Sequence, residues 1–488
     1  MSFQIKPLAA LYSTLESLTQ HEFNFLDPQA KAAVVKLKKT FSNFRKDIWV
    51  GIETSYIDKL YRDTYYYYYS SKLKHYSRET IRLTFFSSEI SIPQFYTNEG
   101  QKALQEGFLG FAVLRPTPQN IFGRNVLNPK IFERNESYHI CTACFEICVY
   151  GTKIIVHGFP HSSQDAEFMV CAETTLWSLL EYFSTRYAEY HPVLPKTIHQ
   201  ILSVTSMQRQ VPSSGLTALQ ISYALKELGF GVKNYINILD LTPDFKTIIK
   251  IYIESGIPVV VAIKNEKGIA HVFNISGRTG YQNKGFGYTV LETLSNEINL
   301  LNYYESPASY LAMDDNLTPY STISLDNPAC NYESENWEDC KIVAAIIPLH
   351  RRIYKDAQKA QTSAIQHLKW LAQNNNLPGD LVLRLLLSSS RSFKNSIAQN
   401  PDLPPDIKTL ILSVDMPKFV WIAELGTPES YSVGKATGMI LMDATEPIRS
   451  ENLACFMEKL YIGNHNGEIG FFDITLPPFK MHTNLNSI

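Results

Sequence analysis

The sequence predicts an α+β protein in which a central domain lies between two flanking α+β regions. Three observations lead to this class. The chain has 488 residues, more than one ordinary core holds, since domains usually contain about 100–200 residues. Helical and strand periodicities both recur along its whole length. The pattern also changes near positions 137 and 350, so we expect three parts: residues 1–136, 137–349 and 350–488.

The composition is that of a globular chain, with 45% hydrophobic and 19% charged residues, enough apolar side chains for a sizeable core. A net charge of -2 creates no extended positive electrostatic field that would attract phosphates or anionic lipids. Nucleic acid and membrane surfaces are therefore not expected partners. No run approaches the roughly 18 apolar residues of a spanning helix. The N-terminus lacks a secretory pattern, and the seven cysteines fit free thiols in a reducing compartment, so we expect a cytoplasmic protein.

The first region mixes helical and extended patterns. The stretches "ALYSTLESLTQ" and "AKAAVVKLKKTFSNF" predict helices, the second starting from a turn at Asp27 and Pro28. "GFLGFAVLRPTPQNIFGR" predicts a strand that ends at Arg115, before a proline. The tyrosine run at residues 65–69 fits a strand or a buried helix, with aromatic ligand stacking as the alternative.

The central region begins with "YHICTACFEICVYGTKIIVHGF", which predicts a hairpin about Gly151. "SQDAEFMVCAETTLWSLLEYF" then predicts a helix over residues 172–187. One buried stripe is expected on this helix, formed by Leu176, Leu179, Leu180 and Phe183. Two more helices follow, "GLTALQISYALKELGF" with Thr217 as N-cap and "TPDFKTIIKIYIESG", and each ends at a glycine.

Strands complete the central region. "IPVVVAI", a turn at residues 265–268 and "IAHVFNISG" predict a hairpin, and "SYLAMDDNLTPY" predicts a further strand running into a loop. "DNPACNYESENWEDC" is acidic and irregular, and we expect a surface excursion before the strand "KIVAAIIPL".

The last region predicts a C-terminal α+β domain. It opens with the helical "RRIYKDAQKAQTSAIQHLKWLAQ" and later contains the strand-like runs "KFVWIAEL" and "ATGMILMDAT". Trp421, Glu424 and Asp443 lie in these runs. These residues could line a site. They are explained equally well as buried strand residues with a cap at the strand end.

Cys171 is the candidate nucleophile. A catalytic thiol needs a lowered pKa, a base partner and donors for the developing oxyanion. Cys171 lies at the predicted helix start, where unpaired backbone N–H groups and the helix dipole favour a thiolate. Glu173 opposes this by charge repulsion, so a histidine partner is required. Considered alone, Cys171 is explained better as a small buried side chain.

His271 is the expected partner because it interrupts the apolar strand "IAHVFNISG". Asp314, at the end of "YLAMD", is suited to orient the imidazole. Asp315 is the alternative, since strand alternation points the two carboxylates to opposite faces. Gln164 is placed to contribute a side-chain amide to an oxyanion hole beside the backbone N–H of Cys171. The four residues in this order favour a catalytic site.

This order of residues resembles the papain-like cysteine peptidase fold. "GLTALQISYALKELGF" and "GIPVVVAIKNEKGIAHVFNISG" are most similar to the bacterial branch that includes the bacteriocin-processing peptidase domains of ABC exporters. The resemblance covers about residues 137–349 and implies an α+β domain in which a helix begins at the nucleophile and an antiparallel sheet carries His271 and Asp314. It implies a thiol peptidase or isopeptidase that cleaves a peptide or protein substrate through an acyl-enzyme, without a cofactor. The implied roles are nucleophile for Cys171, general base and acid for His271, orienter for Asp314 and oxyanion donor for Gln164.

The chain departs from that family in three places. Gln164 precedes Cys171 by one position more than is usual, and "VCA" replaces the family's Asp-Cys-Gly run. The gap between His271 and Asp314 is longer and implies an inserted hairpin in "RTGYQNKGFGYTVLETLSNEINLLNYY".

Other functions remain open on the sequence alone. The same triad also suits an acyltransferase, and a degenerate peptidase fold suits a binding or scaffold module. Under the second alternative, the flanking regions contact a partner protein or form a homo-oligomer. "CTACFEIC" has the short cysteine spacing of metal ligands, with His139 nearby. No second pair with that spacing follows, and alternation separates Cys141 from Cys144 and Cys148, so we expect no metal site there.

Overall fold

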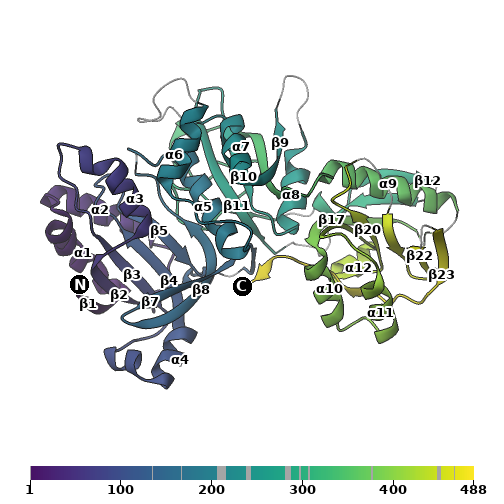
Figure 1. Cartoon of the computed structure of the whole chain (residues 1–488), viewed down its shortest axis with the longest axis horizontal. Helices are drawn as coiled ribbons and strands as arrows, with labels where there is room; N and C mark the ends of the chain where they lie inside the picture. The colour runs from purple at the N-terminus through teal and green to yellow at the C-terminus, as the bar shows by residue number, and fades with distance from the viewer. Residues whose placement is uncertain are drawn as a thin grey trace.

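The computed structural model is a mixture of helices and sheets, which confirms the α+β class (Figure 1). The described strands form three large sheets and one small two-stranded sheet. The structure describes residues 2–134, 136–165, 167–205, 216–237, 243–280, 287–295, 298–305, 308–374, 377, 379–447, 452–465 and 468–488. Within these residues, no helix has the length and apolar character that crossing a bilayer requires.

The first sheet has seven strands and is antiparallel throughout. Across the sheet its strands are β1 (Phe3–Pro7), β2 (Trp49–Tyr56), β3 (Thr80–Phe86), β4 (Phe108–Leu114), β5 (Phe122–Leu127), β8 (Thr152–His161) and β7 (Ala143–Val149). The helices of this part are α1 (Leu8–Phe23), α2 (Asp27–Thr40), α3 (Lys59–Tyr67) and α4 (Asn98–Gly107). The predicted helices α1 and α2 and the strand β4 are confirmed. The tyrosine run is divided between the end of α3 and a 3-10 turn at Tyr69–Ser71.

The predicted hairpin is β7 and β8. Its turn has positive φ at Tyr150 (45°) and Gly151 (87°), the conformation that two-residue hairpins favour. β8 pairs with β5, and Gly158 is needed there because a Cβ would lie 2.5 Å from the Leu127 carbonyl oxygen. The hairpin therefore belongs to the first sheet, although it lies after position 137 in the sequence.

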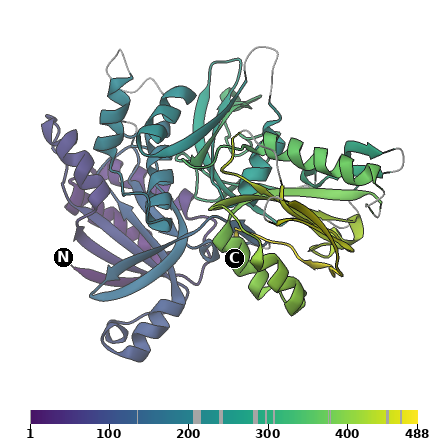
Figure 2. The same ribbon diagram turned by 45° about the vertical axis from the view of Figure 1, so that its right-hand side comes forward.

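The central sheet is also antiparallel. Across the sheet its strands are β15 (Ser321–Ile323), β14 (Tyr310–Met313), β11 (Ala270–Thr279), β10 (Val259–Lys264), β16 (Lys341–His350) and β9 (Phe230–Ile236). β6 (Tyr138–Ile140) pairs with β11, and β25 (Asn486–Ser487) pairs with β6. This last pairing brings the end of the chain back to the middle of the molecule, as the label C shows in Figures 1 and 2.

Four helices accompany the central sheet: α5 (Cys171–Arg186), α6 (Pro195–Val204), α7 (Ala218–Glu227) and α8 (Phe245–Glu254). α5 packs against β7 and β8 of the first sheet and against β11 of the central sheet. All its residues from Ala172 to Phe183 are buried. The predicted single stripe was therefore too narrow, because two sheets enclose the helix.

The third sheet is mainly C-terminal, and among its described strands only the β13–β17 pair is parallel. Across the sheet its strands are β12 (Val290–Ser295), β13 (Ile298–Asn302), β17 (Leu381–Ser389), β18 (Phe419–Gly426), β20 (Gly438–Asp443), β21 (Asn452–Phe456), β22 (Leu460–His465) and β23 (Glu468–Asp473). The remaining elements are α9 (Ala357–Gln373), α10 (Ser390–Gln399), α11 (Pro405–Ser413), α12 (Pro428–Ser432), β19 (Lys435–Ala436) and β24 (Phe479–Lys480). The hairpin predicted between His271 and Asp314 is β12–β13, and it extends this third sheet.

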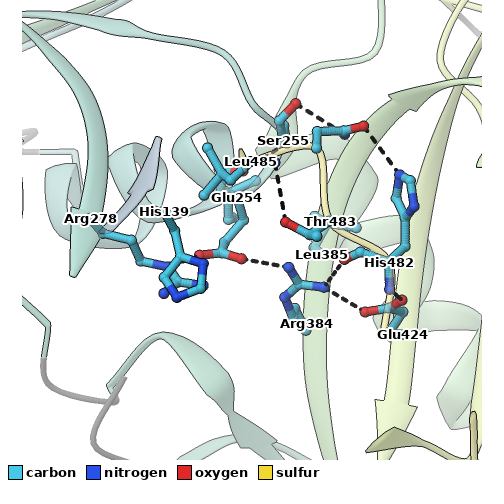
Figure 3. A network of polar contacts seen from close by, with 12 residues as sticks. His139, Glu254, Ser255, Arg278, Arg384, Leu385, Glu424, His482, Thr483 and Leu485 are labelled. Carbon is cyan, nitrogen blue, oxygen red and sulfur yellow. Dashed lines mark hydrogen bonds and ion pairs between the residues drawn. The ribbon is translucent and has the colours of Figure 1, made fainter. Parts of the chain in front are cut away.

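A buried polar network joins the central and C-terminal sheets (Figure 3). Arg278 on β11 donates to Glu254 at the end of α8, and Arg384 on β17 binds Glu254 and Glu424. Burial opposes ionisation of Glu254, but the two arginines outweigh it and lower the pKa of this carboxyl to about 2. Glu424 also accepts the backbone N–H of His482 at 2.7 Å, so the last segment of the chain is tied to the same network.

Candidate active site

Cys171 is the first residue of α5, one position before the helix start that the sequence predicts. Val170 precedes it in an extended conformation (φ -98°, ψ -179°) and has no polar side chain with which to cap the helix. The first backbone N–H groups of α5 are therefore not occupied by a side chain of the N-cap residue. The thiol is partly exposed, unlike the rest of the first two turns of the helix.

The loop before Cys171 is organised by one buried carboxylate. Asp165 Oδ1 accepts the backbone N–H groups of Glu167 (3.0 Å), Phe168 (2.8 Å) and Met169 (2.9 Å). Three charge-assisted hydrogen bonds to a single oxygen fix the course of the backbone. The entry of the chain into α5 is set by this turn.

α5 is held on β11 by two hydrogen bonds one turn after Cys171. Thr175 Oγ1 donates to the carbonyl oxygen of Val272 (3.1 Å), and Asn274 Nδ2 donates to the carbonyl oxygen of Thr175 (2.9 Å). Both β11 residues lie within three positions of His271. These bonds fix the start of the helix relative to the strand that carries the histidine.

His271 lies between the thiol and a carboxylate. Its Nε2 is 2.9 Å from Asp314 Oδ1, and the same ring makes a hydrogen bond with the Cys171 side chain. Because Nε2 faces Asp314, Nδ1 is the nitrogen left for the thiol. The structure thus brings together three of the four residues predicted from the sequence.

Asp314 makes this hydrogen bond rather than Asp315, whose Oδ1 is 3.6 Å from Nε2. β14 ends at Met313, so both aspartates lie beyond the strand and its alternation does not separate them. Asp314 also accepts the hydroxyl of Tyr332 at Oδ2 (2.9 Å) and the backbone N–H of Asn316 at Oδ1 (2.9 Å). Its carboxylate is therefore held from three sides.

The electrostatics favour an ionised His271–Asp314 pair. Burial alone would lower the pKa of His271, but the charge and hydrogen bond of Asp314 outweigh burial and raise it well above its usual value. Burial likewise opposes ionisation of Asp314, and His271 reverses this effect and lowers its pKa. Histidine and aspartate hold each other in the charged forms.

Two further buried acids lie near this pair. Burial raises the pKa of Asp315 to about 7 and that of Glu173 to about 7. Glu173 is therefore only partly ionised near neutral pH. The repulsion that the sequence predicts between Glu173 and a thiolate is correspondingly weaker than that of a full negative charge.

The excursion over residues 326–341 covers His271 with two aromatic rings. Tyr332 and Trp337 stack at 3.8 Å and 17°, and both meet the imidazole edge-on, at 6.1 Å and 5.7 Å between centroids. They also line a cavity of about 650 Å³. Its acidic lining residues are Asp326, Glu333, Glu335, Glu338 and Asp339. Sequence reasoning predicted only a surface excursion; its signal was a tyrosine and a tryptophan within an acidic, irregular segment.

His161 is a second histidine that sequence reasoning missed. Asn125 Nδ2 donates to His161 Nδ1 (2.9 Å), so the ring proton lies on Nε2 and is donated to the carbonyl oxygen of Asp314 (2.9 Å). Burial lowers the pKa of His161 to about 4 and keeps the ring neutral. The first sheet thus holds the backbone of Asp314 in place through β8.

Gln164, the predicted oxyanion donor, lies on the loop before Cys171 and is half-buried. Its side-chain amide donates to the side-chain oxygen of Asn316. Asn316 Nδ2 in turn donates to the hydroxyl of Tyr332 (3.2 Å), which reaches Asp314. Gln164 is therefore linked to the His271–Asp314 pair through Asn316 and Tyr332.

Possible metal ligands gather at the same place. Among the residues that the structure describes, one group of histidine, cysteine and acidic side chains has its ligand atoms within 4.8 Å of one another: His271, Asp314 and Asp315. The cysteines of "CTACFEIC" form no such group in the described chain. Cys144 and Cys148 are both exposed on one face of β7, whereas Cys141 is buried and lies before that strand.

Comparison with known proteins adds no family to this description. No protein-family model matches the chain, and no curated protein matches it. The assignment of a function therefore depends on the geometry around Cys171 and His271.

Proposed function

We propose that the protein is a thiol hydrolase of the peptidase or isopeptidase type, with Cys171 as its nucleophile. One observation carries the proposal: Cys171 begins a buried helix and shares a hydrogen bond with His271, whose Nε2 is 2.9 Å from Asp314. A thiol, an imidazole and an orienting carboxylate in this order are the parts of a nucleophilic triad.

The reaction begins when the sulfur of Cys171 attacks the carbonyl carbon of a substrate amide. The C–S bond forms and the carbonyl electron pair moves to oxygen. His271 then donates the proton on Nδ1 to the leaving amine as the C–N bond breaks. In the second half, His271 takes a proton from water, whose oxygen attacks the thioester, and the sulfur leaves as thiolate. Asp314 keeps Nε2 protonated and the ring oriented throughout.

The oxyanion is stabilised by the backbone N–H of Cys171 and by the side chain of Gln164. An amide NH₂ group carries two protons, and only one is needed for the bond to Asn316. The second is available to the substrate. This is the role that the sequence predicts for Gln164.

Two further features support hydrolysis rather than a purely structural role. His271 and Asp314 are both buried, and the low local dielectric strengthens the hydrogen bond between them. The thiol is partly exposed, so a substrate carbonyl has access to the sulfur. A scaffold would need neither an accessible thiol nor a histidine held in its charged form.

The test is cleavage of a diverse peptide library by the purified full-length chain, with new termini identified by mass spectrometry. We expect cleavage at a limited set of sequences, and its loss in Cys171→Ala and in His271→Ala. A lysine-linked isopeptide series extends the test to isopeptidase activity. Added amine nucleophiles separate hydrolysis from acyl transfer through the products formed. Cleavage that persists in Cys171→Ala would rule out the proposal.

A further inference from the structure

Asp315 is a buried acid whose side chain makes no hydrogen bond within the described part of the chain, and its one ion pair there is the 3.6 Å contact with His271. Its side chain is 3% exposed, and neither carboxylate oxygen has a hydrogen-bond partner among the described residues. A buried carboxylate normally pairs with a cation or a donor, since desolvation makes an isolated charge costly. The triad does not require Asp315, because Asp314 already binds His271.

Asp315 points to the same atom as Asp314. Its Oδ1 is 3.6 Å from His271 Nε2, and Asp314 Oδ1 is 2.9 Å from that nitrogen. A tetrahedral ion with bonds of about 2.0–2.1 Å separates its ligands by about 3.3 Å. The two measured separations lie on either side of this value, and all three ligand atoms lie within 4.8 Å of one another.

The surroundings also resemble those of a metal centre. Tyr332 and Asn316 hold the Asp314 carboxylate by hydrogen bonds, as outer-shell residues do for metal ligands. Tyr332, which binds Asp314, also lines the neighbouring cavity of about 650 Å³. Its acidic lining attracts cations toward the site.

We propose that His271 Nε2, Asp314 and Asp315 reversibly bind a divalent cation of the zinc class, with water as the fourth ligand. One imidazole and two carboxylates suit such borderline ions. Binding releases the Nε2 proton to solvent and leaves the ring proton on Nδ1. His271 then cannot accept a proton from water, so the cation inhibits the hydrolase that we propose. The site itself does not depend on that activity.

The probe is Co²⁺, whose visible absorption reports tetrahedral coordination without any assay of activity. The titrated protein is the full-length chain carrying Cys144→Ser and Cys148→Ser, which removes the exposed thiols of β7 as competing ligands. We expect one Co²⁺ per chain and displacement by Zn²⁺. Asp315→Asn should weaken binding at least tenfold.

Glu173→Gln is the matched control, because it removes a buried carboxyl that is not one of the three ligands. The Co²⁺ affinity of this variant should stay within threefold of that of the titrated protein. Thermal melts establish that each variant is folded. A second test uses the chain with all its cysteines unchanged. Zn²⁺ should raise the melting temperature of this protein, and the rise should be smaller in its Asp315→Asn variant. The proposal is overturned if the chain binds no Co²⁺, or if Asp315→Asn binds it equally well. Alkylation of Cys171 in metal-free buffer tests the hydrolase separately.

Discussion

The side chains around Cys171 fall into two groups. His271, Asp314, Tyr332 and His161 each make a hydrogen bond that fixes their orientation. Glu173 is instead buried on α5, with one carboxyl oxygen unpaired among the described residues. The hydrogen bonds of the first group hold the site residues in place for the reaction. The burial of Glu173 instead makes the free energy of unfolding depend on pH.

Glu173→Gln should reduce the pH dependence of stability. The folded-state pKa of Glu173 is raised by burial from 4.5 to about 7, so its contribution is fully present below pH 4.5 and is lost as pH rises through 7. The shift corresponds to about 3 kcal/mol. Urea unfolding between pH 4.5 and 8 should show a shallower fall in the free energy of unfolding for the variant. Parallel curves for the two proteins would contradict the burial of a titrating acid.

Tyr332→Phe should slow alkylation of Cys171 about tenfold, since hydrogen bonds to charged groups contribute roughly 1.5–3 kcal/mol. The variant loses the donor to Asp314 but keeps a ring that can stack on Trp337. Iodoacetamide labelling followed by peptide mass spectrometry measures the rate. Tyr96→Phe is the control, because Tyr96 is exposed and its hydroxyl meets only that of Tyr150 among the described hydrogen bonds. Equal slowing of alkylation in both variants would contradict the role of the Tyr332 hydroxyl in orienting Asp314.

At the scale of elements, Asp165, the three residues 167–169 that it binds and the start of α5 act as one unit. Asp165→Ala removes an acceptor of three backbone N–H groups and should destabilise the chain by about 2–4 kcal/mol. It should also slow alkylation of Cys171. Asp165→Asn is the matched control, since its amide oxygen can replace Oδ1, and both effects should be smaller. Guanidinium unfolding and labelling kinetics measure them; identical effects of the two substitutions would contradict this role of Oδ1.

Elements were predictable where their signals are local. Thr217 caps α7 as predicted, and Gly229 and Gly256 have the positive φ (92° and 70°) that a helix end requires. The strand with His271 follows from its apolar run. The edge-on packing of Tyr332 and Trp337 against that histidine was not predictable, because it depends on the path of an irregular excursion. His161 was missed because its partner, Asp314, is 153 positions away in the sequence.

At the scale of the whole molecule, Glu254 connects the central and C-terminal sheets through Arg278 and Arg384 (Figure 3). Glu254→Gln leaves two buried guanidinium groups without their shared anion and should destabilise the chain by about 3–5 kcal/mol. Lys369→Ala is the control, because its ion pair with Glu292 is well exposed and should contribute less than about 1 kcal/mol. Chemical unfolding measures both. A loss below 1 kcal/mol for Glu254→Gln would contradict the network's role.

The assignment of strands to sheets was the least predictable feature. β7 and β8 alternate as an ordinary hairpin, and nothing in that pattern indicates that β8 pairs with β5. β12 and β13 likewise lie between His271 and Asp314 in sequence but pair with β17. Sequence periodicity determines which face of a strand is buried, whereas the choice of neighbour depends on long-range packing.

The central claim is that His271 activates Cys171. Its most direct test is the ratio of alkylation rates at Cys171 and at Cys330, an exposed cysteine of the same chain, measured in metal-free buffer at pH 6.5 in the unchanged protein and in His271→Ala. We predict that Cys171 reacts at least tenfold faster than Cys330 and that this advantage disappears in His271→Ala while the Cys330 rate stays constant. Equal rates at the two cysteines in the unchanged protein, or a ratio that survives the loss of the imidazole, would contradict the account.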